Sequence, residues 1–252
     1  MSFYELNKDE RAVLYLEIKN KIEADIISRK YTPSLAYFSD EDTYIRKAAY
    51  IGIGKIFKEK PNLLSVIIQL LEFYFSHPDF KVRQTMINAA GEIGKINFES
   101  VEHFFDKGLF DEHHSPRNAV IGSIKKMGEV NPKPVLNWAK KYLHHENFEI
   151  RREICHGIEL RGRTHPEDIL DMLKELEHDQ KKRVSSTLVH VLGQIAYKKN
   201  CLETVLLHLK SWENSKLVEA AIEEIIDVHY RYRNFSFYTQ EEAKEIIKKA
   251  VF

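Results

Sequence analysis

One segment of about fourteen residues recurs six times along the chain, and this repeat limits the possible folds more than any other feature. The copies begin at residues 44, 81, 115, 149, 183 and 217, so the spacing is 37 residues once and 34 residues four times. Two columns that lie four residues apart are apolar in every copy, as in one face of a helix. They contain Ala49, Met86, Val120, Ile154, Leu188 and Ile222, and then Ile53, Ala90, Ile124, Ile158, Leu192 and Ile226.

A second set of helices is expected between these copies. Prolines at 61, 132 and 166 precede apolar runs, and proline is tolerated in the first turn of a helix. Good N-cap residues open four of the recurring helices: Asp42, Asp79, Asn147 and Ser215. Each unit is therefore a helical hairpin. The sequence predicts an all-α fold, an α-solenoid wound as a right-handed superhelix of about six hairpins.

The segments "SDEDTYIRKAAYIGIGKI" (39–56) and "HPDFKVRQTMINAAGEIGK" (77–95) resemble HEAT repeats of the short bacterial type, an armadillo-like architecture. The resemblance covers roughly residues 30–235. It implies one HEAT-like domain over 1–252, with a capping helix in 1–30, repeats in 31–235 and a second capping helix in 236–252. It also implies that the second helix of each hairpin lines a concave surface.

Four arginines occupy one column of the repeat: Arg46, Arg83, Arg117 and Arg151. In HEAT-like repeats such a column is similar to a structural ladder that binds the cap region of a neighbouring hairpin. A row of anion-binding sites is the alternative interpretation.

Polar residues on the second helices are the candidates for a binding site on the concave face. Their positions recur from copy to copy, so they are expected to form a strip that a protein or another extended ligand could contact. His156 and His190 occupy equivalent positions on adjacent hairpins, roughly 8–10 Å apart by helix spacing, and this distance argues against a shared metal. The candidates are Asn88, Asn118, Arg152, His156, Glu159, His190, Gln194, Glu224 and Asp227.

Basic residues gather towards the ends of the same helices. Cations there offset the negative end of the helix dipole, which needs no ligand. Stacked hairpins would also align them in a row that could follow a phosphate backbone. The phosphate-binding candidates are Lys58, Lys95, Lys126, Arg161, Arg163, Lys198, Arg231 and Arg233.

Composition gives few further indications of function. The 38 Lys and Arg residues equal the 38 Asp and Glu residues, so no overall charge attracts the chain to nucleic acid or to a membrane. Cys155 falls in an apolar column, and Cys201 has no evident histidine partner. Nucleotide-binding and zinc-protease motifs are absent, so no cofactor, metal or catalytic residue is predicted. We expect a cytoplasmic protein without a membrane segment.

The segments "WAKKYLHHENFEIRREICHGIELRG" (138–162) and "HDQKKRVSSTLVHVLGQIAYKKNCLETVLLHLKSW" (178–212) resemble, more distantly, the HEAT-like DNA glycosylases of alkylation repair. That family has a tryptophan and an aspartate near the position of "LFDEHHSPRN" (109–118). Here Asp111 is available but no tryptophan accompanies it, and Trp138 and Trp212 fall on or after first helices, where packing is expected.

The leading functional hypothesis is therefore a non-catalytic scaffold that binds a protein or extended ligand along its concave face. The alternative is a DNA-binding protein, related to those glycosylases, that contacts phosphates through its basic edge. A third possibility is that the repeats assist a protein-modifying reaction, as in some bacterial HEAT-like lyases.

Overall fold

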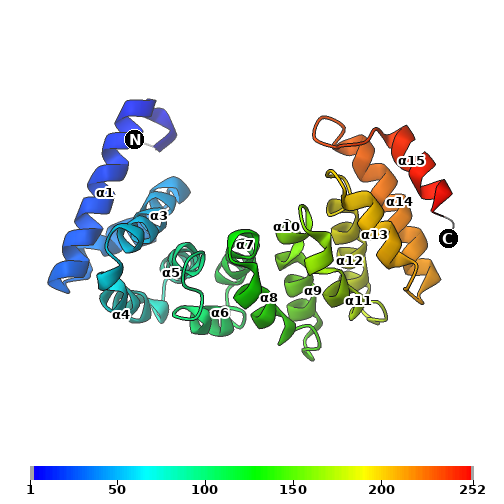
Figure 1. Ribbon diagram of the computed structural model, residues 1–252. Helices are drawn as coiled ribbons and strands as arrows, with labels where there is room; N and C mark the ends of the chain where they lie inside the picture. The colour runs from blue at the N-terminus through cyan, green and yellow to red at the C-terminus, as the bar shows by residue number, and fades with distance from the viewer. Residues whose placement is uncertain (1–2, 251–252) are drawn as a thin grey trace. The chain divides into compact units, whose positions relative to one another are not determined.

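The structure, a computed structural model, describes residues 3–250, and within this range it contains helices and no strand (Figure 1). The predicted all-α class is confirmed. Helices alternate along the chain as stacked hairpins, which is the arrangement of an α-solenoid. No helix among the described residues is long and apolar enough to cross a membrane.

The six recurring segments are helices at the predicted places. They are α3 (Thr43–Glu59), α5 (Phe80–Gly94), α7 (His114–Val130), α9 (Phe148–Gly157) continued by α10 (Glu159–Gly162), α12 (Lys182–Gln194) and α14 (Ser215–Arg231). The two apolar columns are buried in the first five copies. In the sixth copy Ile222 and Ile226 are only half-buried, because within residues 3–250 α14 is followed by the single helix α15 and not by another hairpin.

The intervening helices are mostly shorter than the recurring ones. They are η2 (Thr32–Ser34) with α2 (Leu35–Ser39), η3 (Pro61–Leu63) with α4 (Leu64–Phe75), α6 (Glu102–Gly108), α8 (Pro132–Lys140), η4 (Pro166–Asp168) with α11 (Leu170–Lys174), and α13 (Cys201–Leu209). Pro61, Pro132 and Pro166 each open an element, as predicted.

Capping helices occur at both ends. After a short turn, η1 (Phe3–Glu5), helix α1 (Lys8–Ser28) begins at a capping box made by Asn7 and Glu10. Helix α15 (Gln240–Lys249) begins at a second capping box made by Thr239 and Glu242. The last two residues of the predicted 236–252 segment lie outside the described residues.

Contacts divide the chain into two compact units, residues 1–127 and 128–252, each built on a stack of second helices. In the first unit α3 packs against both α1 and α5. In the second unit α12 packs against both α9 and α14, and α15 packs on α14. The single-domain assignment and the handedness of the superhelix stay predictions.

The N-caps close the first turns of the recurring helices. The side chains of Asp42, Asp79 and Asn147 accept hydrogen bonds from backbone N–H groups of the first helical turn, as predicted. The prediction for Ser215 was wrong by one residue: Asn214 is the cap and accepts from the Leu217 N–H at 3.2 Å.

Two of the four arginines of the column, Arg83 and Arg151, form a structural ladder. The Arg83 guanidinium donates to both carboxylate oxygens of Asp111, at 2.7 and 2.9 Å, and to the carbonyls of His77 and Pro78. Arg151 repeats this pattern with Asp179. Both aspartates belong to the loop before the next recurring helix, so the ladder prediction is confirmed at these two positions.

Arg46 and Arg117 donate to carbonyls of the loop before their own helix, and Arg46 also donates to the Thr43 hydroxyl at 3.4 Å. In these copies the arginine therefore fixes its own N-terminal loop and does not reach the neighbouring hairpin.

Candidate binding face

Three ligand-type side chains of the second unit converge between α9–α10 and α12. The Nε2 atom of His156 lies 3.2 Å from a carboxylate oxygen of Glu159, three residues later and one helical turn away. The His156 and His190 rings lie 6.1 Å apart between centroids. One ligand atom from each of these three residues falls within 4.8 Å of the other two. The argument from helix spacing against a shared metal was therefore wrong, because the side chains reach into the space between the helices.

Glu159 is a buried carboxylate beside the two partly exposed histidines. It is 1% exposed, whereas the His156 and His190 side chains are 37% and 43% exposed. Arg163 donates to Glu159 through Nε at 2.9 Å and to the Gln194 side-chain oxygen at 2.9 Å. This charged pairing makes the burial of Glu159 tolerable and fixes the direction of its carboxylate.

Gln194 extends this network below the surface. It is 1% exposed, and its Nε2 group has no hydrogen-bond partner among residues 3–250. A buried amide with an unsatisfied donor is costly, so this position is one that a ligand or water atom would stabilise.

Glu224 continues the face onto α14. A carboxylate oxygen of Glu224 lies 3.6 Å from the Nδ1 atom of His190 and 2.5 Å from the Arg231 guanidinium. Arg231 also pairs with Asp227 at 2.5 Å. The two acidic candidates of α14 are therefore held by one arginine.

The other face candidates are partly paired or lie in the first unit. Arg152 pairs with Glu149 at 2.8 Å and reaches Glu153 at 3.5 Å. Asn88, half-buried, donates to the Gln84 carbonyl at 3.0 Å, and Asn118 is exposed. The last two belong to the first unit, and the cluster described above lies wholly in the second.

Half of the phosphate-binding candidates are already paired with carboxylates. Lys95 pairs with Glu92, Arg161 with Asp168, Arg163 with Glu159 and Arg231 with Glu224 and Asp227. Of the others, Lys58 is exposed, and Lys126, Lys198 and Arg233 lie over the rings of Tyr50, Tyr197 and Tyr230. Carboxylates thus balance half of the positive charge of this row within the protein.

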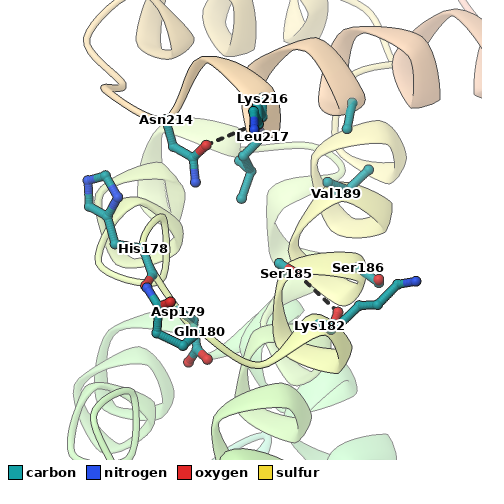
Figure 2. A pocket seen from close by; sticks show the side chains of 11 residues that line it. His178, Asp179, Gln180, Lys182, Ser185, Ser186, Val189, Asn214, Lys216 and Leu217 are labelled. Carbon is teal, nitrogen blue, oxygen red and sulfur yellow. Dashed lines mark hydrogen bonds between the residues drawn. The ribbon is translucent and has the colours of Figure 1, made fainter.

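A cleft of about 630 Å³ lies between the N-terminal halves of α12 and α14. Figure 2 shows Ser185, Ser186 and Val189 of α12 on one side of it and the loop containing His178 on the other. None of its lining residues was predicted from the sequence. Ser186 lies 34 residues after Arg152, a predicted residue of the concave face, and so occupies the same repeat position. This relation could have identified Ser186 as a candidate from the sequence.

The glycosylase-like positions are engaged in packing. The aspartate of this segment, Asp111, has a side chain that is 7% exposed and is bound by Arg83. Burial raises the pKa of the Asp111 carboxyl, but the hydrogen bonds from Arg83 and the His113 N–H outweigh this effect and lower it overall. Trp138 and Trp212 are buried, as expected for packing residues.

The two cysteines are also packing residues. Both are buried. Burial raises the pKa of the Cys155 thiol far above its ordinary value, and it raises that of Cys201 to about 11. Such thiols do not form the reactive thiolate at neutral pH.

Comparison with known proteins gives a fold likeness only. No family model matches the chain, and no curated protein sequence matches it. The structures of smu.31 from Streptococcus mutans UA159 and of AlkD2 from Streptococcus mutans each show 15% identity and a TM-score of 0.48, covering 82% of this chain and 97% of their own. An engineered protein shows 14% identity and a TM-score of 0.37, covering 76% of this chain and 94% of its own. Similarities of this extent carry no argument about activity.

Proposed function

We propose that this chain is a non-catalytic helical-repeat protein that binds a segment of a protein partner along the face formed by α9, α12 and α14. The observation that carries the proposal is that Arg163 and Arg231 are paired with carboxylates of the same face. A surface for phosphate binding needs uncompensated positive charge. A network of balanced, fixed polar groups instead suits recognition by directed hydrogen bonds.

The neighbouring cleft supports a protein segment as the ligand. Val189, Leu217 and Ala220 give it an apolar part, and Ser185 and Ser186 give it hydroxyl groups. Ser186 and His190 lie four residues apart on one helix face, so the cleft adjoins the histidine cluster. One apolar side chain of the partner would fill the cleft while its backbone and polar groups contact the cluster.

The test is capture of partners on immobilised wild-type protein and on two matched variants. Ser186→Arg places a long cation at the edge of the cleft. Leu207→Arg places the same side chain on α13, where Leu207 is 70% exposed and does not line the cleft. We expect proteins captured by the wild type to be retained by Leu207→Arg and lost by Ser186→Arg. Equal capture by both variants would contradict the proposal.

Nucleic-acid binding through the basic row is the alternative. Fluorescence anisotropy with duplex and single-stranded DNA at several salt concentrations tests it, because neutralising several phosphates gives a steep salt dependence. Tight, salt-dependent binding that is lost on charge reversal of Lys58 and Lys126 would favour this alternative over a protein partner. Lys58 and Lys126 are suitable positions because both are exposed and neither supports the histidine cluster.

A further inference from the structure

We infer that His156, Glu159 and His190 form a binding site for a divalent transition-metal ion. This inference is independent of the partner-binding proposal, because it concerns only the chemistry of three side chains within the second unit. Two imidazoles and one carboxylate are a donor set that Zn²⁺ takes in sites that keep a fourth position open.

The distances fit a small closing movement. Metal–ligand bonds of roughly 2.1 Å in tetrahedral geometry separate two ligand atoms by roughly 3.4 Å. His156 Nε2 and the Glu159 oxygen already lie 3.2 Å apart. All three ligand atoms lie within 4.8 Å of one another, so a movement of at most roughly 1.4 Å by His190 completes the triangle. The His190 side chain is 43% exposed and has room for this rotation.

Groups behind the ligands hold two of them in the required direction. Arg163 binds one oxygen of Glu159, while the other oxygen faces His156. Glu224 lies 3.6 Å from Nδ1 of His190, and this contact leaves Nε2 of the same ring for a metal. A carboxylate behind a metal-binding histidine is a common arrangement, because it fixes the tautomer and makes the ring a better donor.

The burial pattern also suits a metal site that a ligand can approach. Glu159 is buried, and the two imidazoles are about two-fifths exposed. The carboxylate thus lies beneath the rings, and the outer side of the triangle faces solvent. Soft or intermediate ions such as Zn²⁺, Ni²⁺ and Co²⁺ are expected to bind, whereas Mg²⁺, which prefers oxygen ligands and water, is not.

The experiment is calorimetric titration of chelator-treated protein with ZnCl₂, repeated with CoCl₂ and MgCl₂. We expect one Zn²⁺ per chain and visible absorption bands on Co²⁺ binding. His156→Ala and His190→Ala should each weaken Zn²⁺ binding at least ~100-fold, because changes behind the ligands alone commonly cost about 10–100-fold. Glu224→Gln removes the carboxylate charge behind His190, and with it the ion pair with Arg231, and should weaken binding by about 10-fold.

His165→Ala is the matched control. His165 is an exposed histidine of the same unit outside the cluster, and its removal should leave Zn²⁺ affinity unchanged. Both ligand histidines are partly exposed, so their replacement by alanine should leave the fold intact, which circular dichroism checks. The inference is overturned if Zn²⁺ does not bind saturably, if the His156→Ala/His190→Ala double variant binds as tightly as the control, or if Mg²⁺ binds as well as Zn²⁺.

Discussion

The clearest test of the arginine ladder is a comparison of Arg83→Met with Arg117→Met. Both arginines donate to two carbonyls of the loop before their own helix. Only Arg83 also binds a carboxylate, through two hydrogen bonds to Asp111. Among residues 3–250 no carboxylate lies within ion-pair distance of Arg117. Methionine keeps most of the aliphatic bulk, so the difference between the variants isolates the ion pair.

The expected magnitude follows from burial. The side chains of Arg83 and Asp111 are 9% and 7% exposed, so Arg83→Met leaves a buried carboxylate without its cation. Removing one partner of such a pair typically costs about 3–5 kcal/mol. Arg117→Met loses two hydrogen bonds from a partly buried group, at about 1–2 kcal/mol in total. We therefore expect Arg83→Met to be the less stable variant by about 2–3 kcal/mol.

Urea unfolding at pH 7 measures this difference, provided the dependence on urea concentration is the same for both variants. The pKa of Asp111 is lowered in the folded protein, so the contribution of the ion pair is present above the unfolded value, about 3.9, and is lost as the pH falls through the folded value. The gap between the variants should thus narrow when unfolding is measured below about pH 4. Variants of equal stability at pH 7, or a gap that widens in acid, would refute the reasoning.

Two further measurements address packing and protonation. A side-chain carbon at Gly162 would overlap Ile169, whereas one at Gly122 would meet no described residue within 4 Å. Gly162→Ala should therefore lower the free energy of unfolding by about 1–3 kcal/mol, and Gly122→Ala should raise it by about 0.5–1 kcal/mol. If urea unfolding shows that both variants change the free energy in the same direction, this description of the packing is wrong. Burial lowers the pKa of His229 despite its hydrogen bond to the Ile225 carbonyl, so the unfolded chain binds the proton more readily. Stability should fall as the pH drops below about 6.5, and the wild type should lose more stability between pH 7 and 5 than His229→Leu. If thermal unfolding shows equal losses for the two proteins, His229 does not cause the loss of stability in acid.

The hairpins could be predicted because each repeat position has one physical role in every copy. The sequence analysis identified the arginines of the ladder but not the two aspartates that bind them. In the third and fifth copies the N-cap position holds His113 or Lys181 and no capping side chain. An aspartate two residues earlier, Asp111 or Asp179, accepts a hydrogen bond from the backbone N–H at that position. The same aspartates receive the arginine of the preceding copy. The Arg83–Asp111 pair recurs as Arg151–Asp179, 68 residues later. The pattern therefore has a period of two repeats, and an alignment of single 34-residue repeats does not show it.

The binding face could be predicted only in part, because column positions give helix faces but not the reach of side chains. The expected separation of His156 and His190 came from helix spacing, and the rings meet between the helices. The basic row contained a signal that was not used: Arg163 follows Glu159, and Arg231 follows Asp227, by four residues. Opposite charges at this spacing pair along a helix, so these arginines were more readily assigned to the face than to a phosphate row.

The position of the histidine cluster gives a metal ion an effect on the fold as well as on the surface. In stacked repeats, stability is approximately a sum over each hairpin and its contacts with its neighbours. The proposed ligands come from α9–α10 and α12, so a bound ion would strengthen one contact between adjacent hairpins, and Glu224 links that contact to α14. An ion that binds only the folded chain stabilises it in proportion to the logarithm of its concentration above the dissociation constant. A bound ion would then raise the affinity of this face for a partner by holding α9, α12 and α14 in fixed positions, even if the partner never touches the ion.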